Sequence, residues 1–129
     1  MAGKIIADTL EHSTAGSLTT DFVVNGSSKA WGNLNGTGTI AIRDSFSVSS
    51  ADDNGTGNYD FNYSNAMGNA NYSAHVTVAE TAAYDNYVNR APVLDGVSTS
   101  DVRFGSCDNN GTTSRDVEIL NVAVHGDLA

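Results

Sequence analysis

Alternating apolar and polar residues, broken by an Asn-Gly pair, constrain the fold of this 129-residue chain more than any other feature. Asn54-Gly55 follows a run that contains Phe46 and Val48, at alternate positions and therefore expected on one face. The run after it places an aromatic residue at every second position: Tyr59, Phe61 and Tyr63. Asn and Gly tolerate the positive φ angles of tight turns, so the segment predicts a β-hairpin with aromatic side chains on a sheet face.

Further candidate strands follow at the spacing typical of a β-sandwich. They are Ala30–Leu34, Gly38–Ile42, Ser45–Ser49, Asn58–Tyr63, Tyr72–Val78, Val102–Gly105 and Asp116–His125. Only 16% of the residues are charged, and the polar remainder is mainly Asn, Ser, Thr and Gly, which argues against a helical bundle. We therefore predict one all-β domain, an antiparallel β-sandwich or jelly-roll-like barrel of about seven or eight strands.

Two segments depart from simple alternation. Asp116–His125 is apolar on both faces, which predicts a strand buried on both sides, either central in a sheet or at a subunit interface. The stretch from Ala79 to Gly96 reads as a short helix or a long loop, ended by Pro92 and Asp95-Gly96.

The first 26 residues are expected to form an N-terminal arm, followed by a single β domain over residues 27–129. Ile5-Ile6 and Phe22–Val24 are short apolar patches separated by a polar stretch, as in a segment that docks onto a neighbouring subunit or oligomerises. The alternative is a first strand preceded by a frayed terminus.

Charge and cysteine content exclude several classes of protein. The formal net charge is −9 and the six basic residues are scattered, so we expect no binding to nucleic acid or anionic membranes. Cys107 is the only cysteine, so no disulfide forms within the chain, and oligomerisation is the expected source of rigidity. The N-terminal residues lack the continuous apolar region of a signal peptide, and no apolar run is long enough to span a membrane.

No pattern of residues predicts a catalytic, cofactor or metal site. Asp52-Asp53 begins a calcium-loop-like stretch, but Tyr63 stands where an EF-hand needs its bidentate Glu, so we interpret it as a hairpin tip that could hold an adventitious ion. His12, His75 and His125 are too far apart in sequence for a zinc motif. Cys107 is interpreted as a small apolar group rather than a nucleophile.

The 79–96 stretch is the expected contact region, because loops on rigid β scaffolds usually carry binding. Tyr84, Tyr87 and Arg90 offer two amphipathic aromatic rings and a set of hydrogen-bond donors suited to a sugar or protein ligand. The alternative is that Tyr84 and Tyr87 simply cover the end of the sandwich.

Residues 29–72 contain a series of short sequence motifs: Lys29–Trp31, Asn35–Thr39, Arg43–Ser50, Asp53–Gly57 and Ala66–Tyr72. This series resembles a module of tail-fibre-like and other structural proteins of tailed bacteriophages, especially phages of marine bacteria and cyanobacteria. Leu18–Gly26 is similar to the lead-in of such proteins. The chain departs from the pattern at Gly32, where a larger residue is usual, and nothing after Ala79 resembles the family.

The resemblance implies a non-enzymatic virion protein of β structure, made in the host cytoplasm and displayed on the particle as an oligomer, commonly a homotrimer. One expected role is a tail-fibre or tip component for host attachment, with the 79–96 stretch touching a surface glycan or protein. The alternative is capsid decoration, in which the arm and the Asp116–His125 strand contact neighbouring subunits. A third alternative, from another class, is a carbohydrate-active enzyme, because the chain has fifteen acidic residues to form carboxylate pairs.

Overall fold

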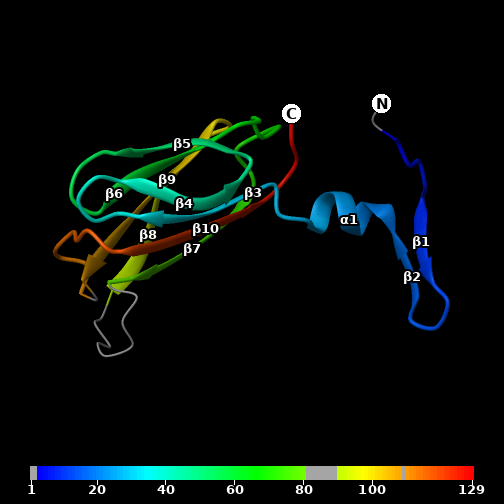
Figure 1. Ribbon diagram of the computed structural model, residues 1–129, viewed down its shortest axis with the longest axis horizontal. Coiled ribbons are helices and arrows are strands. Elements are labelled where there is room, and N and C mark those ends of the chain that lie inside the picture. The colour runs from blue at the N-terminus through cyan, green and yellow to red at the C-terminus, as the bar shows by residue number, and fades with distance from the viewer. Residues whose placement is uncertain (1–2, 81–89, 109) are drawn as a thin grey trace.

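The computed structural model describes residues 3–80, 90–108 and 110–129. Two four-stranded antiparallel sheets stack on each other, and a two-stranded hairpin and one short helix precede them (Figure 1). The first sheet has the order β4 (Ala41–Phe46), β3 (Ala30–Asn35), β10 (Ile119–His125), β7 (Ser73–Ala79). The second has the order β5 (Val48–Asp53), β6 (Asn58–Tyr63), β9 (Asp101–Asp108), β8 (Arg90–Val97). The all-β sandwich is confirmed, and the described strands remain two separate sheets rather than a closed barrel.

The core lies between the sheets and follows the alternation of the sequence. Tyr59 and Phe61 of β6 are fully buried, and Tyr63 is nearly so. They pack with apolar residues that point inward from the other strands: Leu34, Val102, Phe104, Leu120, Val122 and Val124. Every second residue of β6 therefore contributes to the core, as a half-buried strand requires.

The hairpin predicted at Asn54-Gly55 joins β5 to β6. Gly55 has a φ of 118°, a conformation that a residue with a Cβ rarely adopts. The Asn54 amide donates to the Asn58 carbonyl at 2.9 Å, and the Asn58 amide donates to the Gly55 carbonyl at 2.9 Å. The prediction of this turn is confirmed.

The expectation that Phe46 and Val48 share a face is wrong. Ser47, between them, has a φ of 58° and turns the chain from the first sheet into the second. Phe46 ends β4 with an exposed ring, while Val48 begins β5 and packs against the core. The candidate strands Gly38–Ile42 and Ser45–Ser49 are accordingly replaced by Ala41–Phe46 and Val48–Asp53.

Two further expectations need correction. β10 is central, between β3 and β7, but only its inward side chains are buried, whereas Ile119 and Ala123 on the other face are half-buried. The stretch expected as a helix or loop contains β8, which forms the edge of the second sheet. Pro92 fits there because an edge strand need not donate every backbone N–H.

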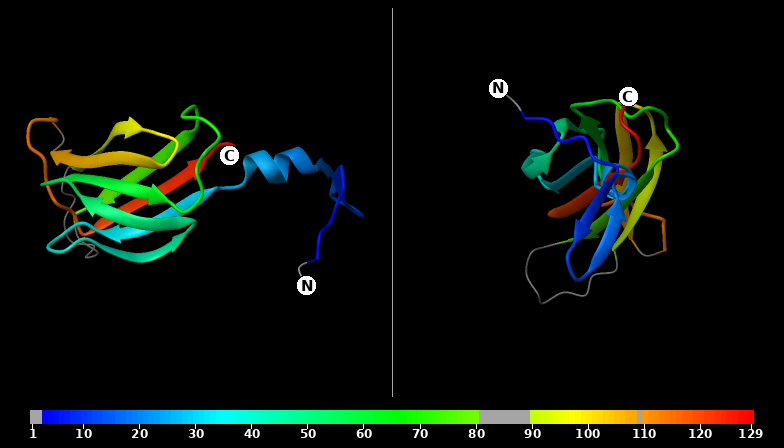
Figure 2. Two further views of the ribbon diagram at one scale, coloured as in Figure 1. Left: turned by 90° about the horizontal axis from the view of Figure 1, so that it is seen from above. Right: turned by 90° about the vertical axis from the view of Figure 1, so that its right-hand side faces the viewer.

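Residues 3–26 contain β1 (Thr9–His12), β2 (Gly16–Thr19) and α1 (Thr20–Gly26). This segment, called the arm below, projects from one end of the sandwich (Figures 1 and 2). It joins the sandwich through Ser28 and Lys29, whose side-chain hydroxyl and backbone amide donate to the Val124 carbonyl at 3.2 and 2.8 Å. The turns at residues 36–40, 54–57 and 110–118 lie at the opposite end, called the loop end below (Figure 1).

Candidate functional site

The expected contact residues are only partly placed by the structure. Tyr84 and Tyr87 lie outside the described residues. Arg90 begins β8; its side chain is only 12% exposed, and its Nη2 lies 2.8 Å from Oε1 of Glu80. Arg90 is thus paired with Glu80, and its exposed surface for a ligand is small.

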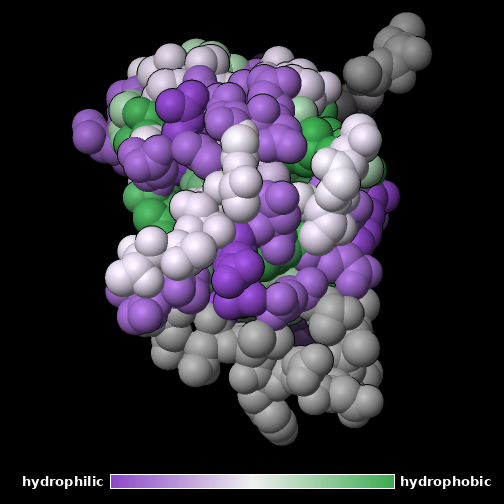
Figure 3. All heavy atoms as spheres, turned by 90° about the vertical axis from the view of Figure 1, so that its left-hand side faces the viewer, coloured by the Kyte–Doolittle hydropathy of each residue, from purple (hydrophilic) through white to green (hydrophobic). Residues whose placement is uncertain are grey.

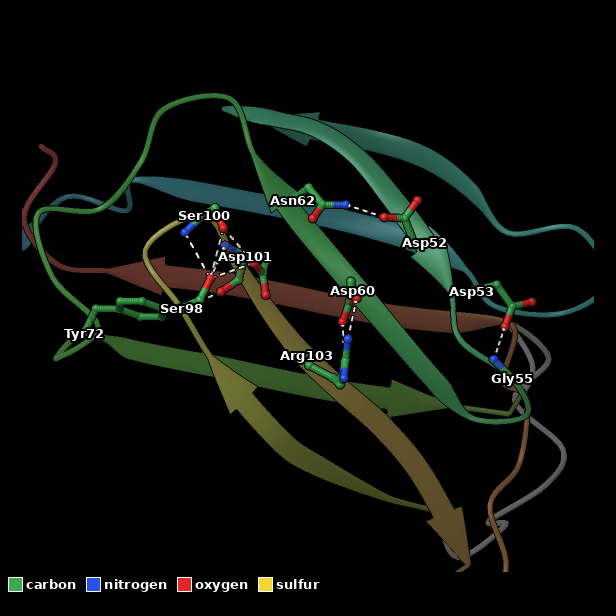
Figure 4. A network of polar contacts seen from close by, with 10 residues as sticks. All are labelled: Asp52, Asp53, Gly55, Asp60, Asn62, Tyr72, Ser98, Ser100, Asp101 and Arg103. Carbon is green, nitrogen blue, oxygen red and sulfur yellow. Dashed lines mark hydrogen bonds and ion pairs between the residues drawn. The ribbon is translucent and has the colours of Figure 1, made fainter.

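Asp52 and Asp53 serve the hairpin in which they stand. The Asn62 amide donates to Asp52 at 2.8 Å across the strand pair, and the Gly55 backbone amide donates to Asp53 at 2.9 Å (Figure 4). Both carboxylates therefore accept hydrogen bonds that hold the turn. In the described part of the chain, no group of three His, Cys, Asp or Glu side chains is arranged to hold a metal ion.

The outer face of the second sheet carries charged residues that pair with one another. Arg103 on β9 donates from Nε and Nη2 to the two carboxylate oxygens of Asp60 on β6, at 2.6 and 2.8 Å (Figure 4). These bonds hold the pKa of the Asp60 carboxyl below its ordinary value. The hydroxyls of Ser98 and Ser100 both donate to Asp101, at 2.6 and 2.8 Å. The carboxylates of Asp60 and Asp101 are thus both engaged by side chains of the same face.

The fold brings two of the three histidines together. The rings of His75 on β7 and His125 on β10 lie edge to face with centroids 5.8 Å apart, and Ser73 Oγ lies 3.0 Å from Nε2 of His75. His12 lies in the arm, on β1. Cys107 is half-buried on β9, with its thiol 3.7 Å from the Ala91 carbonyl oxygen. The Ser73 hydroxyl is thus within hydrogen-bond distance of the His75 imidazole on the exposed side of β7, whereas the Cys107 thiol contacts a backbone carbonyl.

The surfaces at the two ends of the molecule differ in character. The loop end is mostly hydrophilic where its residues are described (Figure 3). The arm exposes seven large apolar side chains: Ile5, Ile6, Leu10, Leu18, Phe22, Val23 and Val24. Ile5 is 91% exposed and Phe22 is 67% exposed, and no residue of α1 is buried. Large apolar surface left open in this way marks a site of contact with another molecule.

The outer face of the first sheet combines aromatic and amide side chains in neighbouring rows. Trp31 on β3 is paired in register with Phe46 on β4, and both rings are exposed, at 38% and 56%. In the next row, the Asn33 amide donates to Asn121 at 2.6 Å. The Asn121 amide in turn donates to Thr77 at 3.2 Å. We call this surface, formed by Trp31, Phe46, Asn33, Asn121 and Thr77, the amide–aromatic face.

Sequence reasoning did not identify the amide–aromatic face. Its residues come from four strands, and Thr77 and Asn121 lie far from Trp31 in the chain. One signal was present, because Trp31 is the single tryptophan of the chain and stands among small and polar residues. The pairing of β3 with β10 that completes the face is not visible in any local pattern.

Comparison of the chain with family models, curated proteins and solved structures finds no match. Among the described residues, no helix has the length and apolar character needed to cross a membrane.

Proposed function

We propose that this chain is a non-enzymatic structural protein of a bacteriophage particle, fastened through its arm and displaying its sandwich for host attachment. The exposed apolar surface of the arm carries the proposal. The resemblance of residues 29–72 to tail-fibre-like modules supplies the virion setting.

The arm needs a partner to keep its structure. A helix of seven residues and a hairpin of two four-residue strands are each marginal in water on their own. Neither buries a residue against the sandwich. Docking onto another chain would remove the seven exposed apolar side chains from water and offset the entropy of ordering the arm.

The partner we propose first is another copy of this chain, in a homotrimer. Most of the net charge of −9 lies on the sandwich, so the sandwiches repel one another while the arms can pack. The hydrophilic loop end then points away from the assembly, where host contacts would occur (Figure 3). The described flanks of the 79–96 stretch, the end of β7 at Ala79 and the start of β8 at Arg90, lie toward this end (Figure 1). The stretch, with Tyr84, Tyr87 and Arg90, remains the predicted contact loop.

Capsid decoration is the second candidate, and the same arm favours it. An arm with exposed apolar residues could reach across neighbouring capsid subunits as readily as it could form a trimer. The two roles differ in where the protein sits, so gold-labelled antibodies on particles of the encoding phage separate them. Label at the tail supports attachment, label over the head supports decoration, and particles without the protein contradict both.

The arm is tested by the double variant Phe22→Ser/Val24→Ser, with Val93→Ser on β8 as the matched control. Val93 is also an exposed apolar residue but lies outside the arm. Sedimentation should show an assembly for the wild type and the control, and a monomer with unchanged β circular dichroism for the double variant. A wild-type chain that is monomeric at micromolar concentration would contradict self-assembly through the arm.

Host attachment is tested by competition. Purified trimer should reduce adsorption of the phage to its host, and substitution of Tyr84, Tyr87 and Arg90 by Ala should remove this effect while the trimer persists. Unchanged competition by the substituted trimer would contradict the contact-loop prediction.

A further inference from the structure

The two outer faces of the sandwich have different chemistry. On the second sheet, Asp60 pairs with Arg103, and Asp101 accepts from two serines, so both carboxylates are engaged by neighbouring side chains (Figure 4). On the first sheet, the amide–aromatic face leaves two aromatic rings open to solvent. This face is therefore available for a ligand in a way that the charged face is not.

Packing of the core does not explain why residue 31 is a tryptophan. Its neighbours Ala30 and Gly32 are buried, so the indole points outward from β3. The core is filled instead by other aromatic residues, of which Tyr59, Phe61 and Phe104 are fully buried. The largest apolar side chain of the protein thus lies on the surface, next to Phe46 on the paired strand. Tryptophan at an exposed site is typical of a binding surface, because it offers a large rigid apolar area with few torsions to order.

The adjacent row adds directional hydrogen bonding. Asn33, Asn121 and Thr77 occupy three neighbouring strands and are linked by side-chain bonds of 2.6 and 3.2 Å, which fix their orientation. Each amide offers two N–H donors and one acceptor oxygen, so the two bonds within the row leave capacity for a ligand. Neighbouring strands are about 4.8 Å apart, so the row extends roughly 10 Å, which suits two linked sugar units.

The charged residues on and beside the amide–aromatic face indicate which class of ligand it can bind. The two rows contain one acid, Asp44, opposite Asn33 in register, and one histidine, His75, opposite Ala123 in the row of Trp31. Their described residues include no lysine or arginine. Arg43, which precedes Asp44 on β4, is bound to Glu118. Its Nη1 lies 2.6 Å from the backbone carbonyl oxygen of Glu118, and its Nη2 lies 3.4 Å from Oε1 of the same residue. An anionic ligand would therefore meet an acidic protein with no lysine or arginine in these rows, and His75 is already engaged with the Ser73 hydroxyl and the ring of His125.

We infer that the amide–aromatic face binds a neutral polysaccharide. The C–H faces of the sugar rings pack on Trp31 and Phe46, and the sugar hydroxyls bond to the amides of Asn33 and Asn121. The inference rests on the proposed attachment role for its biological setting, and it places glycan contact on a sheet face rather than on the 79–96 stretch. A protein partner is less suited to this face, because an interface core would bury the polar row beside the rings.

The test uses the full chain and the fluorescence of Trp31, which as the single tryptophan reports directly on this face. The probes are laminarin, galactomannan and dextran, with dextran sulfate as the charged counterpart of dextran. At least one neutral polysaccharide should shift the Trp31 emission to shorter wavelength and retard the protein in affinity electrophoresis. Dextran sulfate should do neither beyond its effect on an unrelated acidic protein.

Substitutions then locate the site. Trp31→Ala should weaken retardation at least about tenfold, Asn121→Ala should weaken it several-fold, and Trp31→Phe should restore part of it. Val93→Ser, on the opposite sheet, should bind as the wild type does. Circular dichroism checks that the variants are folded, and Asn121→Ala retains the fluorescence readout if Trp31→Ala does not fold.

Four outcomes would overturn the inference: no neutral polysaccharide of the panel binds, only dextran sulfate binds, Trp31→Ala binds as well as wild type, or Trp31→Ala dissociates the assembly. The last would make the face a contact between copies of the chain. Failure here is distinct from failure of the proposed function. Particle labelling and the arm variant test the virion role without any polysaccharide, and polysaccharide binding is measured without particles.

Discussion

The ring of Phe61 lies directly against the backbone of Gly32. A Cβ added at residue 32 would fall 2.6 Å from Cε2 and 3.0 Å from Cζ of that ring. Phe61 is fully buried, so it has little room to move away. This contact leaves no room for a side chain at residue 32 and explains why the chain has glycine there.

We therefore expect Gly32→Ala to destabilise the sandwich by about 1–3 kcal/mol, because it overpacks the core beneath β3. The matched control is Gly96→Ala on β8, where the nearest atom to an added Cβ, Cβ of Arg103, is 3.8 Å away. Urea denaturation of both variants measures the difference. Equal midpoints for the two would contradict the packing argument.

The backbone conformation of Ser47 leads to a second prediction. Its φ of 58° is the only positive value among the described residues other than glycine. Ser47→Val should cost about 1–3 kcal/mol, since a β-branched residue is strained in this region, whereas Ser47→Gly should stay within about 1 kcal/mol of wild type. Ser50→Val, on strand β5, is the control; it loses the bond that the Asn62 amide donates to the Ser50 hydroxyl at 3.0 Å but places valine in an ordinary strand conformation, so it should cost less than Ser47→Val. Thermal unfolding of the three variants tests the order.

The strand Asn58–Tyr63 and the corner at Ser47 show what could and could not be predicted from the sequence. The strand Asn58–Tyr63 was predicted with its observed bounds, because three aromatic residues at period two allow only one face to be buried. The corner at Ser47 was missed, since serine is a weak turn signal and the apolar pattern continues through it. A single unexpected positive φ then moved Phe46 and Val48 into different sheets.

The missed strand and the missed face have related causes. β8 contains Pro92 and Gly96, which indicate a turn in isolation but are acceptable on a sheet edge, where register with β9 decides the structure. The sequence predicted a docking arm but not the helix α1 within it. That helix is only seven residues long, and the side chain of its N-cap residue, Thr19, makes no capping hydrogen bond. The amide–aromatic face depends on β3 pairing with β10, a contact between the two ends of the sandwich sequence.

The hydroxyl of Tyr72 links Tyr63 on β6 to the backbone of Asp101 on β9, and this link supports a third prediction. The hydroxyl of Tyr63 donates to that of Tyr72 at 3.0 Å, and Tyr72 donates to the Asp101 carbonyl at 2.8 Å. Tyr72→Phe leaves the Tyr63 hydroxyl and this carbonyl without those partners and should cost about 1–3 kcal/mol. Tyr63→Phe removes one bond and should cost only about 0.5–1.5 kcal/mol. Chemical denaturation that ranks Tyr63→Phe as the more harmful variant would contradict this chain of bonds.

The Asp60–Arg103 pair predicts a contribution to stability that depends on pH. Because Arg103 lowers the pKa of Asp60 in the folded state, the pair stabilises the protein above the pKa of the unfolded carboxyl, about 4, and this contribution is lost as the pH falls through the lower folded value. Asp60→Asn should therefore be less stable than wild type at pH 7 and should approach it at pH 2–3. The effect is modest, since Arg103 is half exposed to solvent.

The measurement is urea denaturation of wild type and Asp60→Asn across pH 2 to 7. Asp44→Asn is the matched control, because it removes an exposed carboxylate of the first sheet for which the described residues show no ion pair. At high salt the pH 7 difference should persist in part, since two short hydrogen bonds join Asp60 to Arg103 in addition to the attraction of their charges. If Asp60→Asn is destabilised equally at pH 7 and pH 2, the loss comes from packing of the side chain, and the ionised carboxylate is not what stabilises this face of the second sheet.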